Sequence, residues 1–275
     1  MEKELSGKVA LITGGRSGMG KATAQLLAEK GSNIVIISRK QDELEETAEE
    51  ISTASGNKNI FAIAGDVSEE KDVKRIVEQT IKKFGRVDYL LNFAGYAENY
   101  GKISPLRPSP EALEYYKKIR AVDQDGTVAM VFYVEPIMRK QNSGVIITIS
   151  STPVLDVWEN DLLFQIAKSA NIQLTKVLAE QLKTDGFSNV KIYNVSPGNV
   201  FNPSTYKSLN QTQRKASDED GWLNSYNHVA KVVYWILTGK LKLKNGDVLR
   251  LDSGTAPKIF SEVGERYTQF KPNRQ

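Results

Sequence analysis

The sequence has no cysteine and only one histidine, His228. Without cysteine there is no disulfide, no thiolate metal site and no cysteine nucleophile, and a single histidine removes most zinc sites. His228 falls near the start of a predicted helix and away from the predicted strand ends, so we interpret it as structural rather than as part of a Ser-His-Asp triad. We therefore expect neither a metal centre nor a hydrolase triad.

Long hydrophobic runs and strong charge are also missing. No apolar stretch approaches the roughly 18 residues of a membrane-spanning helix, and the N-terminus is charged. We therefore expect no signal peptide, no transmembrane segment and a cytosolic protein. The net charge is only +4 in 275 residues, with basic and acidic side chains interspersed. This balance favours neither nucleic acid nor a membrane surface as a partner.

What the sequence does contain is a glycine-rich turn between a strand and a helix. Val9 to Ile12 is apolar, the turn reads TGGRSGMG over residues 13 to 20, and a helical pattern continues through Ala28. Glycines let the backbone bend tightly and let a phosphate approach it closely. The helix that follows presents unpaired N–H groups and the positive end of its dipole. The turn therefore predicts a phosphate-binding site.

Two other interpretations of the turn stay open. Residues 15 to 21 fit the G-x-x-x-x-G-K pattern of a P-loop, but Ala22 follows where a Mg²⁺ ligand needs a hydroxyl group. A glycine-rich connection with no ligand is the other interpretation, because glycines alone are weak evidence. The spacing of Gly14, Gly18 and Gly20 also differs from the six-residue dinucleotide fingerprint. The choice among the three interpretations of the turn depends on the rest of the chain.

Short apolar strands alternate with helical patterns along the chain. This alternation predicts an α/β fold, a single-domain doubly wound parallel seven-stranded sheet with helices on both faces. The predicted strands are 9–12, 33–38, 59–64, 87–91, 144–149, 190–195 and 247–251. The main predicted helices are 41–54, 69–84, 111–140 with an interruption near 125–126, 160–183 and 225–238. The domain is expected to span 1–275, with a core at about 5–254, a substrate loop at 202–224 and a C-terminal extension at 255–275.

The predicted strand ends carry a series of motifs, and ligands of such sheets bind at these ends. The motifs are TGGRSGMG at 13–20, GDV at 65–67, NFAG at 92–95, Ser151, FQIAK at 164–168 and SPGNV at 196–200. Each motif alone is weak, but in this order and spacing they are specific. Together they resemble the short-chain dehydrogenase/reductase family from Val9 to about Gly254. The resemblance implies a Rossmann-type fold, a nicotinamide cofactor and a small-molecule substrate.

The resemblance also implies which residues hold the cofactor. The glycine turn would carry the pyrophosphate and the adenosine ribose, and Asp66 and Val67 would contact the adenine. Residues 197 to 200 would close over the nicotinamide amide, and Asn202 stands where the family usually has threonine. The implied set is Gly14, Arg16, Ser17, Gly18, Met19, Gly20, Ser38, Arg39, Asp66, Val67, Asn92, Ala94, Gly95, Lys168, Pro197, Gly198, Val200 and Asn202.

The end of the second strand favours NADP(H) over NAD(H). An NAD enzyme places an acid there for the ribose hydroxyls, whereas a 2′-phosphate is repelled by an acid and needs a cation. Here Ser38 stands in place of the acid, Arg39 follows it, and Arg16 lies inside the glycine turn. Two guanidinium groups can hold the phosphate bidentately. The alternative is that both arginines are ordinary solvated surface residues.

The implied active site departs from the family in two places. The family uses a tyrosine to exchange a proton with the substrate, a lysine four residues later, a serine at the preceding strand end and an asparagine in the long helix. Ser151 and Lys168 are present at the family spacing, but Phe164 occupies the tyrosine position and Asp123 the asparagine position. Phe164 has no proton to give.

Three functional interpretations follow from the missing tyrosine, whose loss costs on the order of 10² to 10⁴ in rate. In the first, the proton comes instead from Tyr96, or from Asp123 or Lys168 acting through water. The substrate is an activated C=C bond that needs no tyrosine. Or the domain binds the cofactor as a sensor or scaffold without turnover. Tyr96 and Trp158 are the predicted substrate contacts, and pairing of the two long helices would give a homodimer or homotetramer, as in the family. A P-loop nucleotide hydrolase is a more distant possibility, opposed by Ala22.

Overall fold

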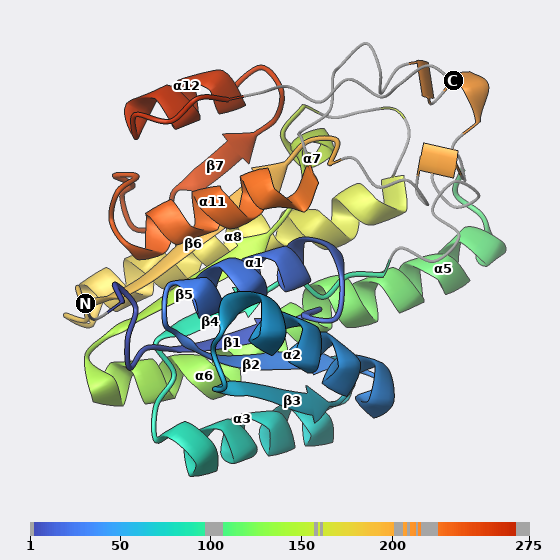
Figure 1. Ribbon diagram of the computed structural model, residues 1–275. Coiled ribbons are helices and arrows are strands. Elements are labelled where there is room, and N and C mark those ends of the chain that lie inside the picture. Colours follow the sequence, from blue (N-terminus) through green and yellow to red (C-terminus); the bar gives the residue numbers. More distant parts are fainter. Residues whose placement is uncertain are drawn as a thin grey trace.

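Seven parallel strands form one sheet in the order β3-β2-β1-β4-β5-β6-β7, which confirms the predicted doubly wound α/β architecture (Figure 1). The computed structural model describes residues 3–96, 107–156, 159, 162–200, 206–207, 210–212, 214–215 and 225–267. The strands are β1 (Val9–Thr13), β2 (Asn33–Ser38), β3 (Ile60–Ala64), β4 (Tyr89–Asn92), β5 (Gly144–Ile149), β6 (Val190–Pro197) and β7 (Val248–Leu251).

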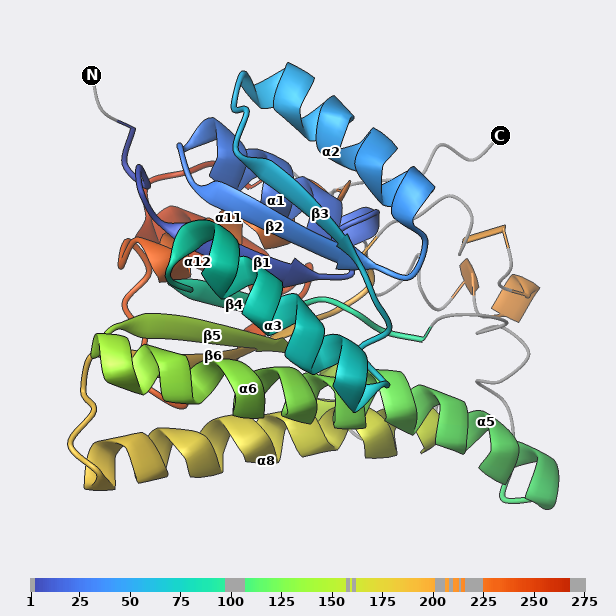
Figure 2. The same ribbon diagram turned by 90° about the horizontal axis from the view of Figure 1, so that it is seen from below.

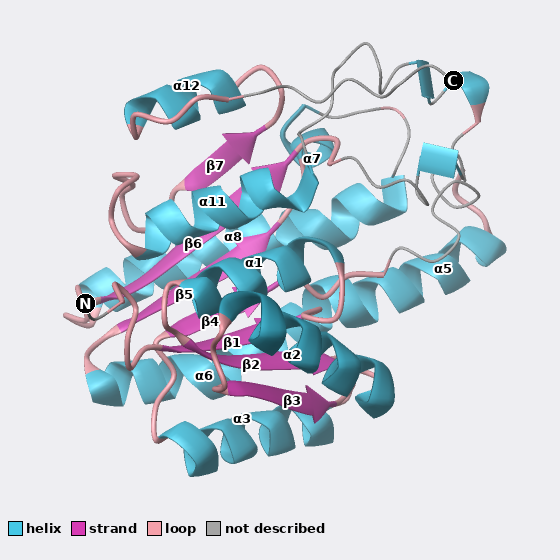
Figure 3. Ribbon diagram, viewed as in Figure 1, coloured by secondary structure: helices cyan, strands magenta, loops and turns pink. Residues whose placement is uncertain are grey.

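Helices connect consecutive strands, and α12 follows the last strand (Figure 3). They are α1 (Gly18–Glu29), α2 (Gln41–Ser55), α3 (Glu70–Phe84), α5 (Pro110–Arg120), α6 (Gly126–Gln141), α7 (Thr152–Asp156), α8 (Leu162–Thr184), α11 (Ser225–Leu237) and α12 (Ala256–Glu262), with a π-helical segment η1 (Ala121–Asp125). Within the described ranges, no helix combines the length and the apolar character needed to cross a lipid bilayer.

Helices cover both faces of the sheet, which explains why its strands are nearly continuous apolar runs. Successive side chains of β1 point to opposite faces. Ala10 and Ile12 pack in the cluster that includes α1 and α11, whereas Val9 and Leu11 pack in the cluster that includes α3 and α6. Figure 2 shows α1 and α2 on one side of the sheet, and α3, α6 and α8 on the other. Two hydrophobic cores therefore hold the sheet in place.

The region between β4 and β5 differs from the prediction of one long helix interrupted near residues 125–126. The chain stays helical from α5 through α6, and the irregularity is the π-helical segment η1, which carries the buried Asp123. A π-helical turn inserts an extra residue into a helix and is frequent at functional sites. The predicted interruption falls where this segment ends and α6 begins, but the sequence does not show that the segment is π-helical, because it does not record which carbonyl each N–H reaches.

Two short helices, α7 and α12, were not predicted. They contain five and seven residues, too few to show a helical period in the sequence. Part of the segment predicted as a loop at 202–224 is also helical, because residues 206–207, 211–212 and 214–215 have helical backbone. Polar composition was therefore a poor guide to structure in this segment.

The carboxyl ends of all seven strands lie at one edge of the sheet because every strand pair is parallel. The strand order reverses at β1, which has β2 on one side and β4 on the other. Open α/β sheets bind ligands in the crevice beyond the carboxyl ends at such a point. The glycine turn follows β1 directly and therefore lies in this crevice.

Candidate functional site

The glycine turn after β1 has a shape that only glycine permits at two positions. Gly14 has a φ of +66°, and a Cβ on it would approach the main chain of Phe93 and Ala94 to 2.9 Å. A Cβ on Gly20 would lie 2.3 Å from the carbonyl oxygen of Gly14. The Ala94 N–H also donates a hydrogen bond to Thr13 Oγ1 over 3.1 Å. The turn is thus closely packed against the segment after β4.

The N-terminus of α1 has the features that suit an anion. Its N-cap residue is Ser17, which has extended backbone and makes no side-chain capping hydrogen bond. The first turn of α1 contains no acidic side chain. The unpaired N–H groups of this turn and the positive end of the helix dipole therefore face the crevice without a negative charge on the same turn.

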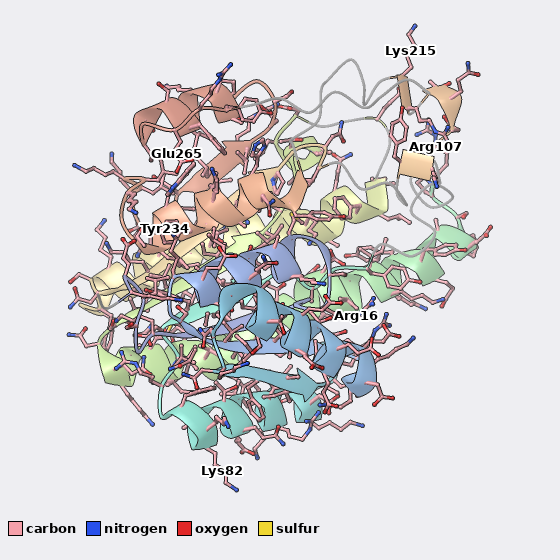
Figure 4. All side chains as sticks on the ribbon, viewed as in Figure 1. Arg16, Lys82, Arg107, Lys215, Tyr234 and Glu265 are labelled. Carbon is pink, nitrogen blue, oxygen red and sulfur yellow. The ribbon has the colours of Figure 1, made fainter. Side chains whose placement is uncertain are left out.

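A cavity of about 300 Å³ opens above this turn at the carboxyl edge of the sheet, where Figure 4 labels Arg16. Twelve of the predicted cofactor residues line it, together with the predicted substrate contact Tyr96. The twelve are Gly14, Arg16, Ser17, Gly18, Met19, Gly20, Ser38, Arg39, Asp66, Val67, Ala94 and Gly95. Residues predicted from four strand ends to share a cofactor therefore lie around one cavity in the fold.

Other predicted cofactor residues do not line this cavity. They are Asn92, Lys168, Pro197, Gly198 and Val200. The Asn92 side chain is buried in the sheet, where its Nδ2 donates to the carbonyl of Ile147 over 3.3 Å. Asn202 and the predicted substrate contact Trp158 lie outside the described residues.

Tyr226, at the start of α11, lines the cavity and was missed by sequence reasoning. A Cβ on Gly18 would lie 3.6 Å from the Tyr226 ring, so the ring covers one side of the glycine turn. Its position depends on the packing of α11 against α1. No local sequence signal predicts that packing, because the two helices are far apart in the chain.

The two arginines of the cavity differ in their surroundings. Arg16 Nη1 lies 2.7 Å from Glu43 Oε2 in the first turn of α2, whereas Arg39 has no carboxylate partner in the described parts of the chain. Lys40 Nζ lies 2.5 Å from the other oxygen of Glu43. The hydrogen bond from Lys40, and then the charges of Lys40 and Arg16, lower the pKa of Glu43 below its usual value. Glu43 is therefore a carboxylate shared by two cations, and it is a second residue that sequence reasoning missed.

The turn after β3 is held by its own acidic side chains. Asp66 Oδ1 accepts hydrogen bonds from the Ser68 N–H over 2.9 Å and from the Ser68 hydroxyl over 2.7 Å. The Asp66 N–H donates to Asp72 Oδ2 over 2.9 Å. These bonds fix Asp66 and Val67, the two residues predicted to contact the adenine, at the rim of the cavity.

The predicted catalytic residues Asp123 and Lys168 form a buried ion pair. Lys168 Nζ lies 2.7 Å from Asp123 Oδ1, and the two side chains are 7% and 1% exposed. The other carboxylate oxygen of Asp123 accepts a hydrogen bond from the Tyr96 N–H over 2.7 Å. Asp123 therefore joins α8, the η1 segment and the end of the cavity where Tyr96 lies.

The main chain at Asp123 is also fixed. Asn171, one turn after Lys168 in α8, donates from Nδ2 to the carbonyl of Asp123 over 3.0 Å and to the carbonyl of Ile149 over 3.1 Å. One buried amide thus ties the π-helical segment to the end of β5. This arrangement holds the carboxylate of Asp123 beside Lys168.

Phe164 lies on the same side of α8 as Lys168, with its ring centroid 5.7 Å from Lys168 Nζ. This distance is within the range of a cation–π contact. Phe164 therefore contributes a ring face to Lys168 but no group that can exchange a proton. The contact agrees with the four-residue spacing, which places both side chains on one helix face.

Ser151 lies at the end of β5, beside the end of β6. Its hydroxyl donates to the carbonyl of Pro197 over 3.4 Å, a long hydrogen bond that leaves the hydroxyl able to exchange partners. The neighbouring Ser150 hydroxyl instead donates to the carbonyl of Lys168 over 3.0 Å. The predicted serine and the predicted closing segment at Pro197 are therefore neighbours.

His228, in the first turn of α11, is not among the residues that line the cavity and lies in an aromatic cluster. Its ring centroid is 5.0 Å from that of Phe260 and 4.9 Å from that of Tyr267, and Trp235 packs on Phe260 at 4.8 Å. Burial, and then the charge of Lys231, lower the pKa of His228 from 6.5 to about 4. A neutral, buried histidine among aromatic rings has a packing role.

Comparisons with known proteins agree with this arrangement. Residues 8–214 match the family model described as short chain dehydrogenase. The chain is 33% identical to a short chain dehydrogenase of Pseudocercospora fijiensis over 72% of this chain and 61% of that protein. It is 27% identical to the 3-oxoacyl-(acyl-carrier-protein) reductase of Thermotoga maritima over 91% of this chain and 98% of that protein.

A solved structure also superimposes on the chain. It is the 3-ketoacyl-(acyl-carrier-protein) reductase from Brucella melitensis complexed with NADH, with a TM-score of 0.77 and 27% identity over 92% of this chain and 100% of that one. The fold and the glycine-lined edge define a doubly wound α/β protein of the Rossmann type. The family match then makes the assignment specific: the chain belongs to the short-chain dehydrogenase/reductase family, a family of oxidoreductases.

Proposed function

We propose that this chain is an NADP(H)-dependent short-chain oxidoreductase, built as one domain over residues 1–275, that acts on a small carbonyl, alcohol or activated C=C substrate. The observation that carries the proposal is the glycine-lined cavity, whose far end is joined through Tyr96 and Asp123 to Lys168. This connection supports a cofactor site that continues into a polar reaction site at the carboxyl edge of the sheet.

The residues of the cavity fit a dinucleotide. The space above the turn depends on the absence of side chains at Gly14 and Gly20, and the N-terminus of α1 offers unpaired N–H groups to a diphosphate. Asp66 and Val67 form the rim where an adenine would lie. The NADH bound to the Brucella melitensis relative supports a nicotinamide cofactor at this edge.

The preference for NADP(H) rests on charge. Ser38 ends β2 without an acid, and Arg16 and Arg39 line the same part of the cavity. Guanidinium groups recognise a phosphate by bidentate hydrogen bonds, which a ribose hydroxyl cannot match. We propose that these two arginines hold the 2′-phosphate.

A bound nicotinamide would supply or accept the hydride. Around it, Ser151 would hydrogen-bond the reacting oxygen, and Lys168 would hold the nicotinamide ribose. Phe164 takes the place of the family tyrosine in this proposal, so the proton must travel by another route. Tyr96 is the best-placed alternative, since it lines the cavity and its main chain is fixed by Asp123.

A second function is favoured by two specific observations. The charge of Lys168 is already balanced by Asp123 inside the protein, and Phe164 cannot exchange a proton. Both features suit a protein that binds the cofactor and has lost turnover, acting as a sensor or scaffold.

We also propose a homodimer or homotetramer through α6 and α8. Phe132 on α6 is 64% exposed and Val177 on α8 is 46% exposed. Large apolar side chains on two long neighbouring helices are typical of a surface covered by another subunit. Sedimentation of the wild type beside Phe132→Glu tests this: a lower oligomeric state in the variant supports it, and an unchanged state contradicts it.

The test of function separates the two candidates. NADPH and NADH are titrated into the wild type, and turnover of a carbonyl and enone panel is then compared with that of Phe164→Tyr. Turnover by the wild type supports the oxidoreductase, whereas NADPH binding without turnover until the phenol is introduced supports the sensor. Absence of binding by either nucleotide would contradict both.

A further inference from the structure

One carboxylate stands next to the arginines proposed for the 2′-phosphate. Glu43, in the first turn of α2, has both oxygens engaged by cations: Oε2 lies 2.7 Å from Arg16 Nη1, and Oε1 lies 2.5 Å from Lys40 Nζ. The side chains of Arg16 and Glu43 are 44% and 36% exposed, so the pair lies at the protein surface and can exchange partners.

The position of Glu43 is fixed by the packing of α2. Thr47, one turn later, is buried, and its hydroxyl lies within hydrogen-bonding distance of both the Glu43 carbonyl, at 2.9 Å, and the Arg16 carbonyl, at 3.3 Å. This hydroxyl fastens α2 directly to the glycine turn. These contacts hold the Glu43 backbone beside the glycine turn, so exchange of partners occurs by rotation of the Arg16 and Glu43 side chains.

The consequence differs between the two cofactors. A 2′-phosphate carries about two negative charges at neutral pH, so it competes with the Glu43 carboxylate for Arg16 and is also repelled by it. A 2′-hydroxyl carries no charge and meets neither penalty. Glu43 therefore lowers the affinity for NADP(H) selectively.

We infer that Glu43 is a specificity-determining residue that limits the preference for NADP(H) by holding Arg16 in an ion pair. The inference rests on the proposed NADP(H) dependence and concerns how strongly NADP(H) is preferred over NAD(H). Exposed ion pairs of this kind are weak, so their removal changes binding by a few-fold rather than by orders of magnitude. The site is thus moderately selective for the phosphorylated cofactor, with Arg39, which has no carboxylate partner among the described residues, as the second guanidinium.

The variant Glu43→Gln tests this by direct binding. The dissociation constants of NADPH and NADH are measured by nucleotide fluorescence at low and high salt. NADPH should bind about three- to tenfold more tightly at low salt, with the gain reduced at high salt, and NADH binding should change by less than about twofold. Glu49→Gln is the matched control, because it removes the same charge from an exposed position of the same helix.

A double-mutant cycle assigns the effect to Arg16. If Glu43 acts mainly by holding Arg16, then the gain in NADPH binding from Glu43→Gln should be clearly smaller in an Arg16→Gln background, where only the direct repulsion of the phosphate remains. Weaker NADPH binding by Glu43→Gln, or a gain equal to that of Glu49→Gln, would overturn the inference. Failure of NADPH to bind the wild type and every variant would instead contradict the proposed function, so the two failures are distinguishable.

Discussion

Lys168 Nζ and Asp123 Oδ1 lie 2.7 Å apart in a nearly closed environment, joining α8 to the π-helical segment before α6. A lysine that assists a tyrosine does so through its positive charge, which stabilises the phenolate. In this chain that charge has a carboxylate partner, and the neighbouring position is Phe164. Phe164 and Asp123, the two residues predicted to depart from the family pattern, therefore belong to one local arrangement.

The first prediction is that introducing a phenol at position 164 gives less activity alone than together with a change at Asp123. In Phe164→Tyr, Asp123 still offsets the charge of Lys168, so the phenol should ionise less readily than in Phe164→Tyr/Asp123→Asn. In the alcohol-oxidation direction, where the phenolate accepts the proton, the double variant should turn over substrate at least about tenfold faster, with the rising limb of its pH–rate profile at lower pH. Steady-state kinetics from pH 6 to 10 measure this. Equal profiles for the two variants would show that Asp123 does not act on the phenol.

The second prediction concerns the stability of the ion pair. Asp123→Ala leaves a buried ammonium without its partner and should lower the free energy of unfolding by about 3 to 5 kcal/mol. Replacing both groups, in Asp123→Leu/Lys168→Met, should recover most of this loss, because no uncompensated charge remains. Urea denaturation followed by circular dichroism measures both. A loss in the double variant as large as in Asp123→Ala would show that packing rather than charge is responsible.

The third prediction concerns the glycine turn. A methyl group at Gly20 would lie 2.3 Å from the carbonyl oxygen of Gly14, so Gly20→Ala must displace the turn. We expect NADPH affinity to fall by at least about tenfold, with a smaller loss of stability. Gly254→Ala is the control, because the nearest atom to its new Cβ is 3.4 Å away, an ordinary contact. Fluorescence titration of both variants measures the effect, and unchanged binding by Gly20→Ala would argue against a nucleotide on this turn.

The fourth prediction concerns His228, whose pKa is lowered from 6.5 to about 4 in the folded state. The unfolded chain binds a proton at this residue below about pH 6.5, whereas the folded chain does not until about pH 4. The stability contribution is therefore complete above pH 6.5 and is lost as the pH falls towards 4, up to roughly 3 kcal/mol.

Urea unfolding at a series of pH values tests the role of His228. The wild type should lose stability between pH 7 and pH 4.5 more steeply than His228→Leu, which has no group to titrate at this position. Because other acids titrate in both proteins, the difference between the two curves is the quantity to compare. Parallel curves would show that His228 binds its proton equally well in the folded and the unfolded protein.

The sequence predicted the sheet well because its strands are buried on both faces. Such strands are apolar along their whole length, as in Val35, Ile36 and Ile37 of β2, so each appears as a short hydrophobic run. The point where each apolar run stops also predicted where the strand ends. Since parallel strands place their carboxyl ends together, residues as distant as Ser38 and Ala94 were correctly expected near one another.

The remaining features depend on contacts that no local pattern records. The ion pair between Arg16 and Glu43 requires α2 to pack on the glycine turn, and Tyr226 reaches the cavity only because α11 packs on α1. The π-helical turn around Asp123 depends on a shift of main-chain hydrogen bonds. These contacts depend on the packing of segments that are distant in the chain, so the sequence pattern of one segment does not predict them.

The aromatic cluster of α11 and α12 sets a practical boundary for shortened versions of this protein. Phe260 is fully enclosed and touches the rings of Trp235 and His228, although it comes after the last strand. A chain cut just past β7 would expose these rings to water and invite aggregation. Shortened versions should therefore retain Tyr267, whose ring centroid lies 5.5 Å from that of Phe260.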